Sequence, residues 1–125
     1  MLADKEVIAT VAVKDLATAR KFYESTLGLK VMSTAGEEAV TFESGGSSLI
    51  VYRSQYAGTN KATALTWNVG DELEATVSAL ADKGVAFKHY DFPGVLRSGA
   101  IHVMGPAKTA WFEDPDGNII ALMSM

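Results

Sequence analysis

The sequence repeats one short pattern twice, and this repeat limits the possible folds more than any other feature. Asp15 precedes Gly28 by 13 residues, and Asp71 precedes Gly84 by the same 13 residues. In both stretches the Asp is a typical helix N-cap and the Gly a typical helix end, with apolar residues at helical spacing between them. Such internal repetition is typical of a fold built from two copies of one supersecondary unit.

The first copy contains one helix among four strands. Residues 6–13 are rich in Val and Thr and predict a strand. The helix follows over residues 15–28, and its apolar face contains Leu16, Ala19, Phe22, Tyr23 and Leu27. Residues 29–34, 37–44 and 47–54 are apolar runs separated by glycine-containing turns and predict three further strands. Alternation along the first strand places Val7, Ala9, Val11 and Val13 in the core under the helix. The order of this copy is therefore β-α-β-β-β.

The second copy starts with the same order. Residues 63–69 predict a strand, residues 71–84 a helix and residues 85–89 the next strand. At its end, Asp114-Pro115-Asp116-Gly117 predicts a tight turn between two apolar strands, because Pro fixes φ and Gly accepts a positive φ. Residues 55–61 are polar and turn-prone, and they form the linker between the copies.

The second copy also contains an additional segment. The turn glycines before the last strands, Gly46 and Gly117, are 71 residues apart rather than the 56 that separate the helices, which leaves about 15 extra residues. We place them within residues 90–108, where Pro93-Gly94 and Gly105-Pro106 bracket a predicted loop. Loops of this length in a compact domain often act as lids over a binding site.

Composition excludes several classes of protein. The chain has 48% apolar and 21% charged residues and no cysteine, so it has neither a disulfide nor a thiolate metal site or nucleophile. No apolar run approaches the roughly 18 residues of a membrane span, and residues 1–14 do not resemble an export signal, so we expect a cytoplasmic protein without a membrane partner. The net charge of −4 and the scattered basic residues argue against nucleic acid as a partner.

Two motifs within this repeat resemble the vicinal oxygen chelate superfamily, the group of glyoxalases, bleomycin-resistance proteins and extradiol dioxygenases. The motifs are VKDLATARKFYESTLGLKV at residues 13–31 and WFEDPDGN, followed by an apolar strand, at residues 111–123. The resemblance covers essentially the whole chain. It implies one α+β domain over residues 1–125, in which two β-α-β-β-β modules, at about 1–54 and 62–125, form a cupped, mixed but mostly antiparallel sheet with helices outside and a ligand cleft inside. It also implies a homodimer, which open sheet edges favour.

The resemblance also implies where a metal ion would be held. Metal-dependent members of the family place two ligands per module inside the cup, seven residues before each helix-capping Asp and four residues after each turn Gly. In this chain the four positions hold Ile8, Ala64, Ile50 and Ala121. None of these side chains has a lone pair for a cation, and an unliganded cation in apolar surroundings would face a large desolvation penalty. We therefore predict no metal ion and no cofactor.

Strand alternation predicts the lining of the cleft. The predicted ligand-binding residues are Ile8, Thr10, Ile50, Tyr52, Ala64, Thr66, Asn68, Ala121 and Met123, with Arg97 and His102 from the additional segment. This surface is apolar with a few neutral polar groups, which suits an uncharged or aromatic ligand held by a few hydrogen bonds. Asn68 could equally bond a neighbouring backbone group, and Arg97 is a candidate clamp for a carboxylate or phenolate. We expect Phe22 and Trp67 to pack in the core.

The leading hypothesis is a metal-independent protein that binds an apolar or aromatic small molecule, and its role would then be sequestration or resistance, as in the bleomycin-resistance proteins that the chain resembles. No catalytic residue is predicted, and His89 and His102 are expected to be exposed or at the cleft rim, since their spacing is not a metal-ligand signature. Two alternatives remain open. One is a lyase or dioxygenase-type enzyme, metal-dependent through His89, His102 or Glu113, or metal-free through Tyr52, His102 or Arg97. The other is an interaction module with a vestigial cleft.

Overall fold

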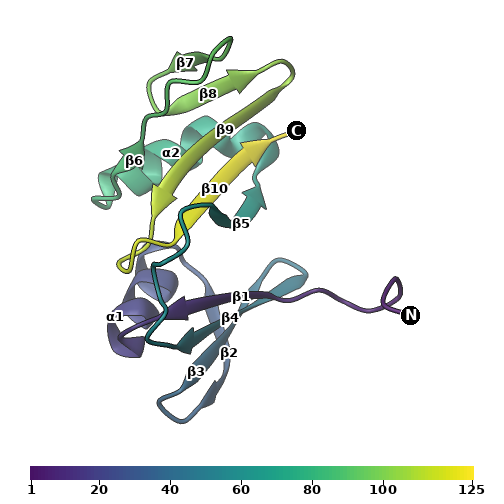
Figure 1. Ribbon diagram of the computed structural model, residues 1–125, viewed down its shortest axis with the longest axis vertical. Helices are drawn as coiled ribbons and strands as arrows, with labels where there is room; N and C mark the ends of the chain where they lie inside the picture. Colours follow the sequence, from purple (N-terminus) through teal and green to yellow (C-terminus); the bar gives the residue numbers. More distant parts are fainter. The chain divides into compact units, whose positions relative to one another are not determined.

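The computed structural model describes all 125 residues and divides them into two compact units, Met1–Gly58 and Thr59–Met125. Each unit contains a mixed β-sheet and one principal helical segment, as Figure 1 shows. The predicted α+β class is therefore confirmed. No helix of the chain has the length and apolarity needed to cross a lipid bilayer.

The first unit is a four-stranded sheet with a helical segment between its first two strands. Its elements are β1 (Ala9–Val13), α1 (Leu16–Arg20), η1 (Lys21–Thr26), β2 (Lys30–Ala35), β3 (Ala39–Ser44) and β4 (Ser47–Arg53). The strand order is β1-β4-β3-β2, in which β1 is parallel to β4 and the other pairs are antiparallel. The predicted β-α-β-β-β order is confirmed for this unit.

The helical segment of the first unit begins and ends where the sequence predicts. The backbone amides of Ala17 and Thr18 donate to Oδ1 of Asp15 at 3.0 and 3.3 Å, which caps the first turn. Gly28, at φ +78°, ends the segment. From Lys21 the helix widens into a π-helix, in which the Leu27 amide donates to the Phe22 carbonyl at 2.9 Å. The sequence pattern contains no signal for this widening.

The helix covers only one face of the first sheet. Alternate residues of the strands are buried on that face, among them Val11, Val13, Val40, Phe42, Leu49 and Val51, and they pack with Ala19 and Tyr23 of the helical segment. The Tyr23 and Phe42 rings are 6.0 Å apart. The other residues of each strand lie on the opposite, open face.

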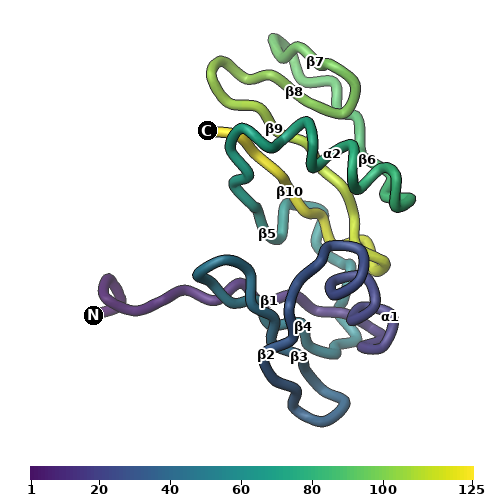
Figure 2. Tube along the Cα trace, turned by 180° about the vertical axis from the view of Figure 1, so that it is seen from behind, coloured from purple at the N-terminus to yellow at the C-terminus, as the bar shows by residue number.

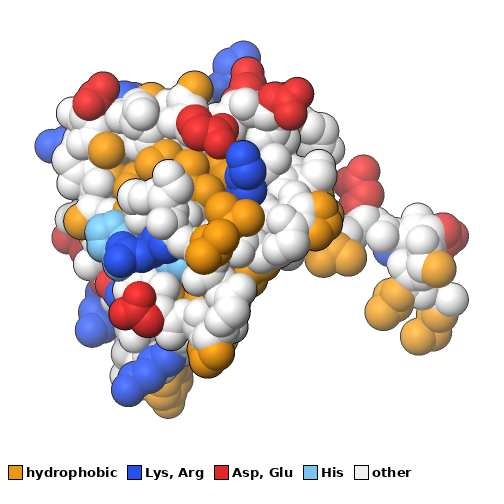
Figure 3. All heavy atoms as spheres, turned by 90° about the horizontal axis from the view of Figure 1, so that it is seen from above, with side chains coloured by type: hydrophobic (Ala, Val, Ile, Leu, Met, Phe, Trp, Pro, Cys, Tyr) orange, Lys and Arg blue, Asp and Glu red, His pale blue; other side chains and the backbone are white.

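The N-terminal residues depart from the sequence prediction. Strand β1 begins only at Ala9, and the preceding residues extend away from the sheet (Figure 1). Val7, predicted to pack under the helix, is 92% exposed, so that prediction was wrong. The β1–β4 ladder ends at the Ala9–Leu49 pair although β4 itself begins two residues earlier, at Ser47, so Val7 lies beyond the last paired residue and is not held against the sheet. Figure 3 shows apolar side chains on this projecting segment.

The second unit is a six-stranded sheet with the same basic order and an added hairpin. Its elements are β5 (Thr63–Asn68), η2 (Gly70–Glu72), α2 (Leu73–Asp82), β6 (Phe87–Lys88), β7 (Leu96–Ser98), β8 (Ile101–Met104), β9 (Ala107–Glu113) and β10 (Ile119–Ser124). The strand order is β5-β10-β9-β8-β7, and β6 also pairs with β9. Strand β5 is parallel to β10, and the other pairs are antiparallel.

Two predictions for the second unit were wrong in detail. Asp71 does not cap the helix with its side chain, because it lies inside the short 3₁₀ turn Gly70–Glu72 and α2 begins only at Leu73. The segment 90–108 is not one long loop, because it contains the β7–β8 hairpin. The turn residue Gly99, at φ +60°, lies between two short runs that can pair as strands, which is a hairpin signal. The bracketing pairs Pro93-Gly94 and Gly105-Pro106 obscured this signal.

The turn between β9 and β10 is held by one buried carboxylate. Asp114 is 5% exposed, and its Oδ1 accepts hydrogen bonds from the backbone amides of Asp116 and Asn118 at 3.0 and 2.8 Å. Its Oδ2 accepts from the side-chain amide of Asn118 at 2.8 Å. Gly117 adopts φ +89°. The predicted tight turn is confirmed, and the Asp side chain is what organises it.

Replacing Asp114 with Ala is expected to lower the free energy of unfolding by about 2 to 3 kcal/mol, because the buried amides of the turn lose their acceptor. Urea denaturation followed by circular dichroism measures this change. The exposed Asp91 provides the matched control, and Asp91→Ala should change stability by less than about 0.5 kcal/mol. Equal effects of the two substitutions would contradict the role assigned to Asp114.

Candidate functional site

The open face of the second sheet brings together most of the predicted ligand-binding residues. Helix α2 lies on one side of β9 and β10, as Figures 1 and 2 show, and Phe112, Ile120 and Leu122 are buried on that side. The opposite face carries two rows of side chains that run across three strands. One row is Trp111, Ala121 and Thr66, and the other is Thr109, Met123 and Asn68. Residues opposed in a ladder point to the same side, so these six side chains share one face.

An aromatic cluster borders this face. It consists of Tyr90 and Phe92, which follow β6, together with His102 of β8 and Trp111 of β9. The Trp111 ring lies 4.9 Å from His102, 5.3 Å from Tyr90 and 6.0 Å from Phe92, measured between ring centroids. Phe92 remains 43% exposed. The additional segment therefore provides an apolar, aromatic edge next to the two rows of side chains.

His102 holds the additional segment in place. It is fully buried, and its Nε2 accepts a hydrogen bond from the Tyr90 backbone amide at 2.9 Å. Its Nδ1 lies 3.3 Å from the Thr109 carbonyl oxygen. Since Nε2 must be the acceptor, the proton of the neutral ring is on Nδ1 and is donated to that carbonyl. The expectation of an exposed or rim histidine was wrong for His102, because both ring nitrogens are used inside the unit.

Other predicted residues of the second unit have different surroundings. The Asn68 side-chain oxygen accepts from the Gly70 amide at 3.2 Å, so Asn68 takes the local bonding role that its position before a turn allows. Ala64 lies at an irregularity where the β5–β10 register shifts, and Arg97 is exposed on β7 opposite His102. Ala121 is 3% exposed, which makes it part of the floor of the face rather than its rim.

The predicted residues of the first unit gather on the open face of its own sheet. Thr10 pairs with Ile50, and Ala12 pairs with Tyr52, along the parallel β1–β4 ladder. Tyr52 is partly exposed, and the Thr10 hydroxyl donates to the Ile8 carbonyl at 3.2 Å. Ile8 itself lies one residue before β1. This face is apolar with neutral hydroxyl groups and carries no ionisable group except the tyrosine among its predicted residues.

Of the four positions at which the resemblance predicts metal ligands, Ile50 and Ala121 lie at equivalent places in the two sheets. Thr10 lies opposite Ile50 in the first sheet, and Thr66 lies opposite Ala121 in the second. Ile8 lies just before β1, and Ala64 lies at the register shift of the β5–β10 ladder, so neither has a ladder partner. The aliphatic side chains at the four positions offer no donor atom, so they do not fit a metal ion. Nowhere in the structure do three or more His, Asp or Glu side chains gather as a metal site would require.

Glu113, the acidic residue considered as an alternative ligand, is paired with a lysine. Its Oε1 accepts from Nζ of Lys88 at 2.9 Å. This hydrogen bond raises the pKa of the Lys88 ammonium. Lys88 Nζ also lies 5.9 Å from the Tyr90 ring centroid, at the edge of the aromatic cluster. The opposite charges of Lys88 and Glu113 therefore compensate each other beside the β6–β9 ladder.

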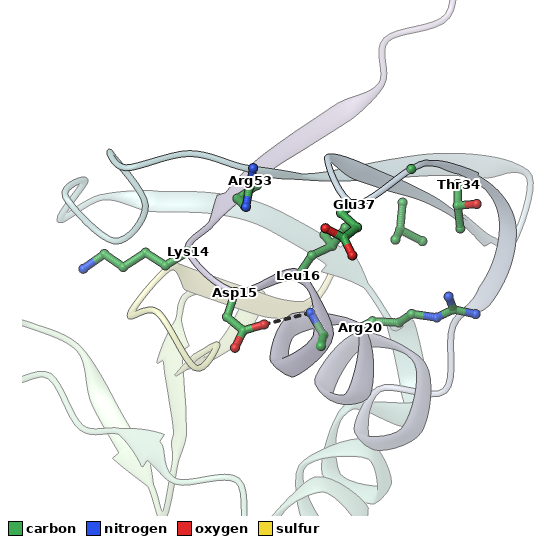
Figure 4. Close-up of a pocket in the computed structure, with 10 residues that line it drawn as sticks. Lys14, Asp15, Leu16, Arg20, Thr34, Glu37 and Arg53 are labelled. Carbon is green, nitrogen blue, oxygen red and sulfur yellow. Dashed lines mark hydrogen bonds between the residues drawn. The ribbon is translucent and has the colours of Figure 1, made fainter.

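A hollow lies in the first unit, on the side of the sheet that carries the helix. It has a volume of about 610 Å³ and lies between the start of α1 and the turn after β2. Its wall includes Leu16, Arg20, Thr34, Glu37 and Arg53 (Figure 4). Sequence reasoning missed this hollow because its residues come from four separate segments without a shared motif. Arg53 is paired with Glu38 at 2.7 Å, and Asp15 is used in the helix cap.

Comparison with known families identifies the chain. The family model described as the Glyoxalase/Bleomycin resistance protein/Dioxygenase superfamily matches residues 7–122. The chain belongs to this superfamily, as the two motifs and the repeat indicated. A search of curated protein sequences finds no match.

Solved structures agree with this assignment at the level of the fold. A glyoxalase family protein from Enterococcus faecalis superposes with a TM-score of 0.75 at 16% identity, covering 99% of this chain and 100% of the other. A lactoylglutathione lyase from Agrobacterium tumefaciens gives 0.73 at 15% identity, covering 97% and 93%. A structure from the mobile metagenome of V. Pseudocholerae gives 0.68 at 21% identity, covering 99% and 96%. These similarities establish the fold. Any activity has to be inferred from the residues of the site.

Replacing His102 with Phe should loosen the segment that follows β6, although it keeps an aromatic ring against Trp111. The buried Tyr90 amide would lose its acceptor, so its hydrogen exchange should accelerate by at least roughly tenfold. Exchange of the Tyr90 amide, followed by nuclear magnetic resonance, measures this directly. His89→Phe, at an exposed position, should leave the exchange unchanged. Undiminished protection of Tyr90 in the His102 variant would show that the segment is held by other contacts.

Proposed function

We propose that this chain is a metal-independent small-molecule-binding protein that holds a neutral apolar or aromatic ligand against the open faces of its sheets. The observation that carries the proposal is the row Trp111, Ala121 and Thr66 beside the aromatic cluster. This surface combines a flat indole ring, a small floor residue and an exposed hydroxyl. Such a mixture of apolar area and few polar groups is typical of sites for uncharged ligands.

The identity of the residues at the four family positions supports binding without a metal ion. Aliphatic side chains there provide apolar area where a metal-dependent relative would need oxygen or nitrogen donors. The corresponding space on each face is then available to the ligand. Sequestration of a toxic or signalling molecule needs only this binding, without a reacting group.

The groups considered for catalysis have structural partners in the structure, which favours binding over turnover. Both nitrogens of His102 are hydrogen-bonded within the second unit, and Glu113 is paired with Lys88. A lyase or dioxygenase reaction through either residue would require these bonds to break first. Tyr52 is accessible on the first sheet, where no second reactive group of the predicted set lies. Arg97 is accessible opposite His102, but both ring nitrogens of that histidine are already hydrogen-bonded.

The same proposal includes a second copy of the chain. Strand β1 is an edge of its sheet, and the residues before it expose Met1, Leu2 and Val7. An exposed edge continued by apolar side chains is a surface that partner subunits often cover.

Substitution of Thr66 with Arg tests the binding face. The bulky cation should block the row formed with Ala121 and Trp111, and the affinity for the neutral aromatic p-cresol should fall by roughly tenfold or more. Nuclear magnetic resonance provides the measurement, because the indole N–H signals of Trp67 and Trp111 are separate reporters on the two sides of the sheet, and Trp67→Phe assigns them. In the wild-type protein, p-cresol should shift the Trp111 signal and leave the Trp67 signal nearly unchanged.

The matched control is Ser78→Arg, which places the same cation on the exposed surface of α2. It should bind p-cresol like the wild-type protein. The absence of any Trp111 shift at saturating p-cresol, or equal binding by the Thr66→Arg variant, would overturn the assignment of this face.

A further inference from the structure

One buried hydroxyl group on the open face of the second sheet has no hydrogen-bond partner. Thr109 lies on β9 and is 3% exposed, and its Oγ1 neither donates nor accepts a hydrogen bond in the structure. Its own carbonyl is bonded to His102, so the backbone of this residue is satisfied while the side chain is not. A buried, unpaired hydroxyl is destabilising, and such groups in native proteins commonly mark a place where a ligand or water completes the bonding.

The position of this hydroxyl is fixed by the two ladders of β9. Thr109 lies opposite His102 on one side and opposite Met123 on the other. It is two residues before Trp111 on the same strand, so both side chains are on the open face. The hydroxyl therefore lies in the same surface as the indole ring and the aromatic cluster.

A flexible side chain lies beside Thr109 on this face. Met123 is opposite Thr109 in the ladder and is only partly buried. Met is unbranched and adapts its rotamers at little expense. Displacement of Met123 by a ligand ring would open access to the hydroxyl without changing the backbone.

We propose that Thr109 is the buried hydrogen-bonding anchor of the ligand, and that the ligand is a neutral planar aromatic compound with one hydroxyl or carbonyl group, a phenol or a quinone-like ketone. This inference rests on the proposed binding function and specifies its ligand. The aromatic ring contacts Trp111, and the polar group reaches Oγ1 of Thr109. A threonine hydroxyl can donate to a carbonyl or accept from a phenol, so it recognises both groups.

The surroundings of Thr109 select against charged ligands. Its ladder neighbours His102 and Met123 offer no charge, because Nε2 of His102 accepts the Tyr90 amide and therefore carries no proton. Arg97 follows His102 in the same row but lies one strand further out and is exposed. A carboxylate or ammonium group buried here would lose its hydration without gaining an opposite charge. The neutral form of the polar group is the one that fits.

The test compares two ligands and three proteins. Toluene and p-cresol have nearly the same shape and differ by one hydroxyl, and their dissociation constants are measured from the Trp111 indole shift. Wild-type protein should prefer p-cresol by roughly five- to tenfold. Thr109→Val, which keeps the shape and removes the hydroxyl, should reduce this preference to about one. Thr109→Ser, which keeps the hydroxyl, should retain it.

Stability provides a second readout for the same variants. Because the hydroxyl has no partner in the ligand-free protein, Thr109→Val should leave the melting temperature unchanged or raise it. A clear drop in melting temperature would mean that the hydroxyl already has a partner, such as a buried water, and would overturn the inference. An unchanged preference for p-cresol in Thr109→Val would overturn it as well. In both cases the proposed function would survive. If neither toluene nor p-cresol shifts the Trp111 signal, the proposed function itself is overturned.

Discussion

The second unit depends on the hydrogen bonds that the carboxylate of Asp114 accepts. By accepting the amides of the β9–β10 turn, it fixes the register in which Trp111 lies opposite Ala121 and Thr109 lies opposite Met123. A slip by one residue would move each of these side chains to the helix side of the sheet. The open face, with its indole ring and its unpaired hydroxyl, therefore exists because one turn is held in one geometry.

Each sheet is covered by helix on one face only, and this asymmetry explains how one fold can serve for many ligands. The covered face contains aliphatic and aromatic residues that provide stability, such as Phe42 in the first unit and Phe112 in the second. Residues on the open face contribute less to this packing, so they can vary with less effect on the fold. In this chain Ile50 and Ala121 occupy such positions, and an aromatic cluster borders the second sheet. This chain belongs to the glyoxalase and bleomycin-resistance superfamily, and we propose that it uses this surface to bind a ligand without a metal ion.

The sequence predicts the fold well because its signals are local. The Asp15 cap, the glycine stops and the Asp114 turn each act through neighbouring residues, and the structure confirms all three. Alternation also placed Thr66, Ala121 and Met123 on one face, since a strand has only two sides. The contacts of His102 and the aromatic cluster were not predicted, because they join residues from three separate segments and depend on the β7–β8 hairpin, whose turn signal at Gly99 was obscured.

Metal content is the measurement that tests this account most directly. The protein is loaded separately with excess Ni(II), Zn(II), Mn(II) and Fe(II), desalted, and analysed for bound metal by elemental analysis. The account predicts well below one equivalent of each metal per chain, because Ile8, Ile50, Ala64 and Ala121 offer no donor atoms. About one tightly held equivalent of any of these metals would contradict it and would direct attention to lyase and dioxygenase activity.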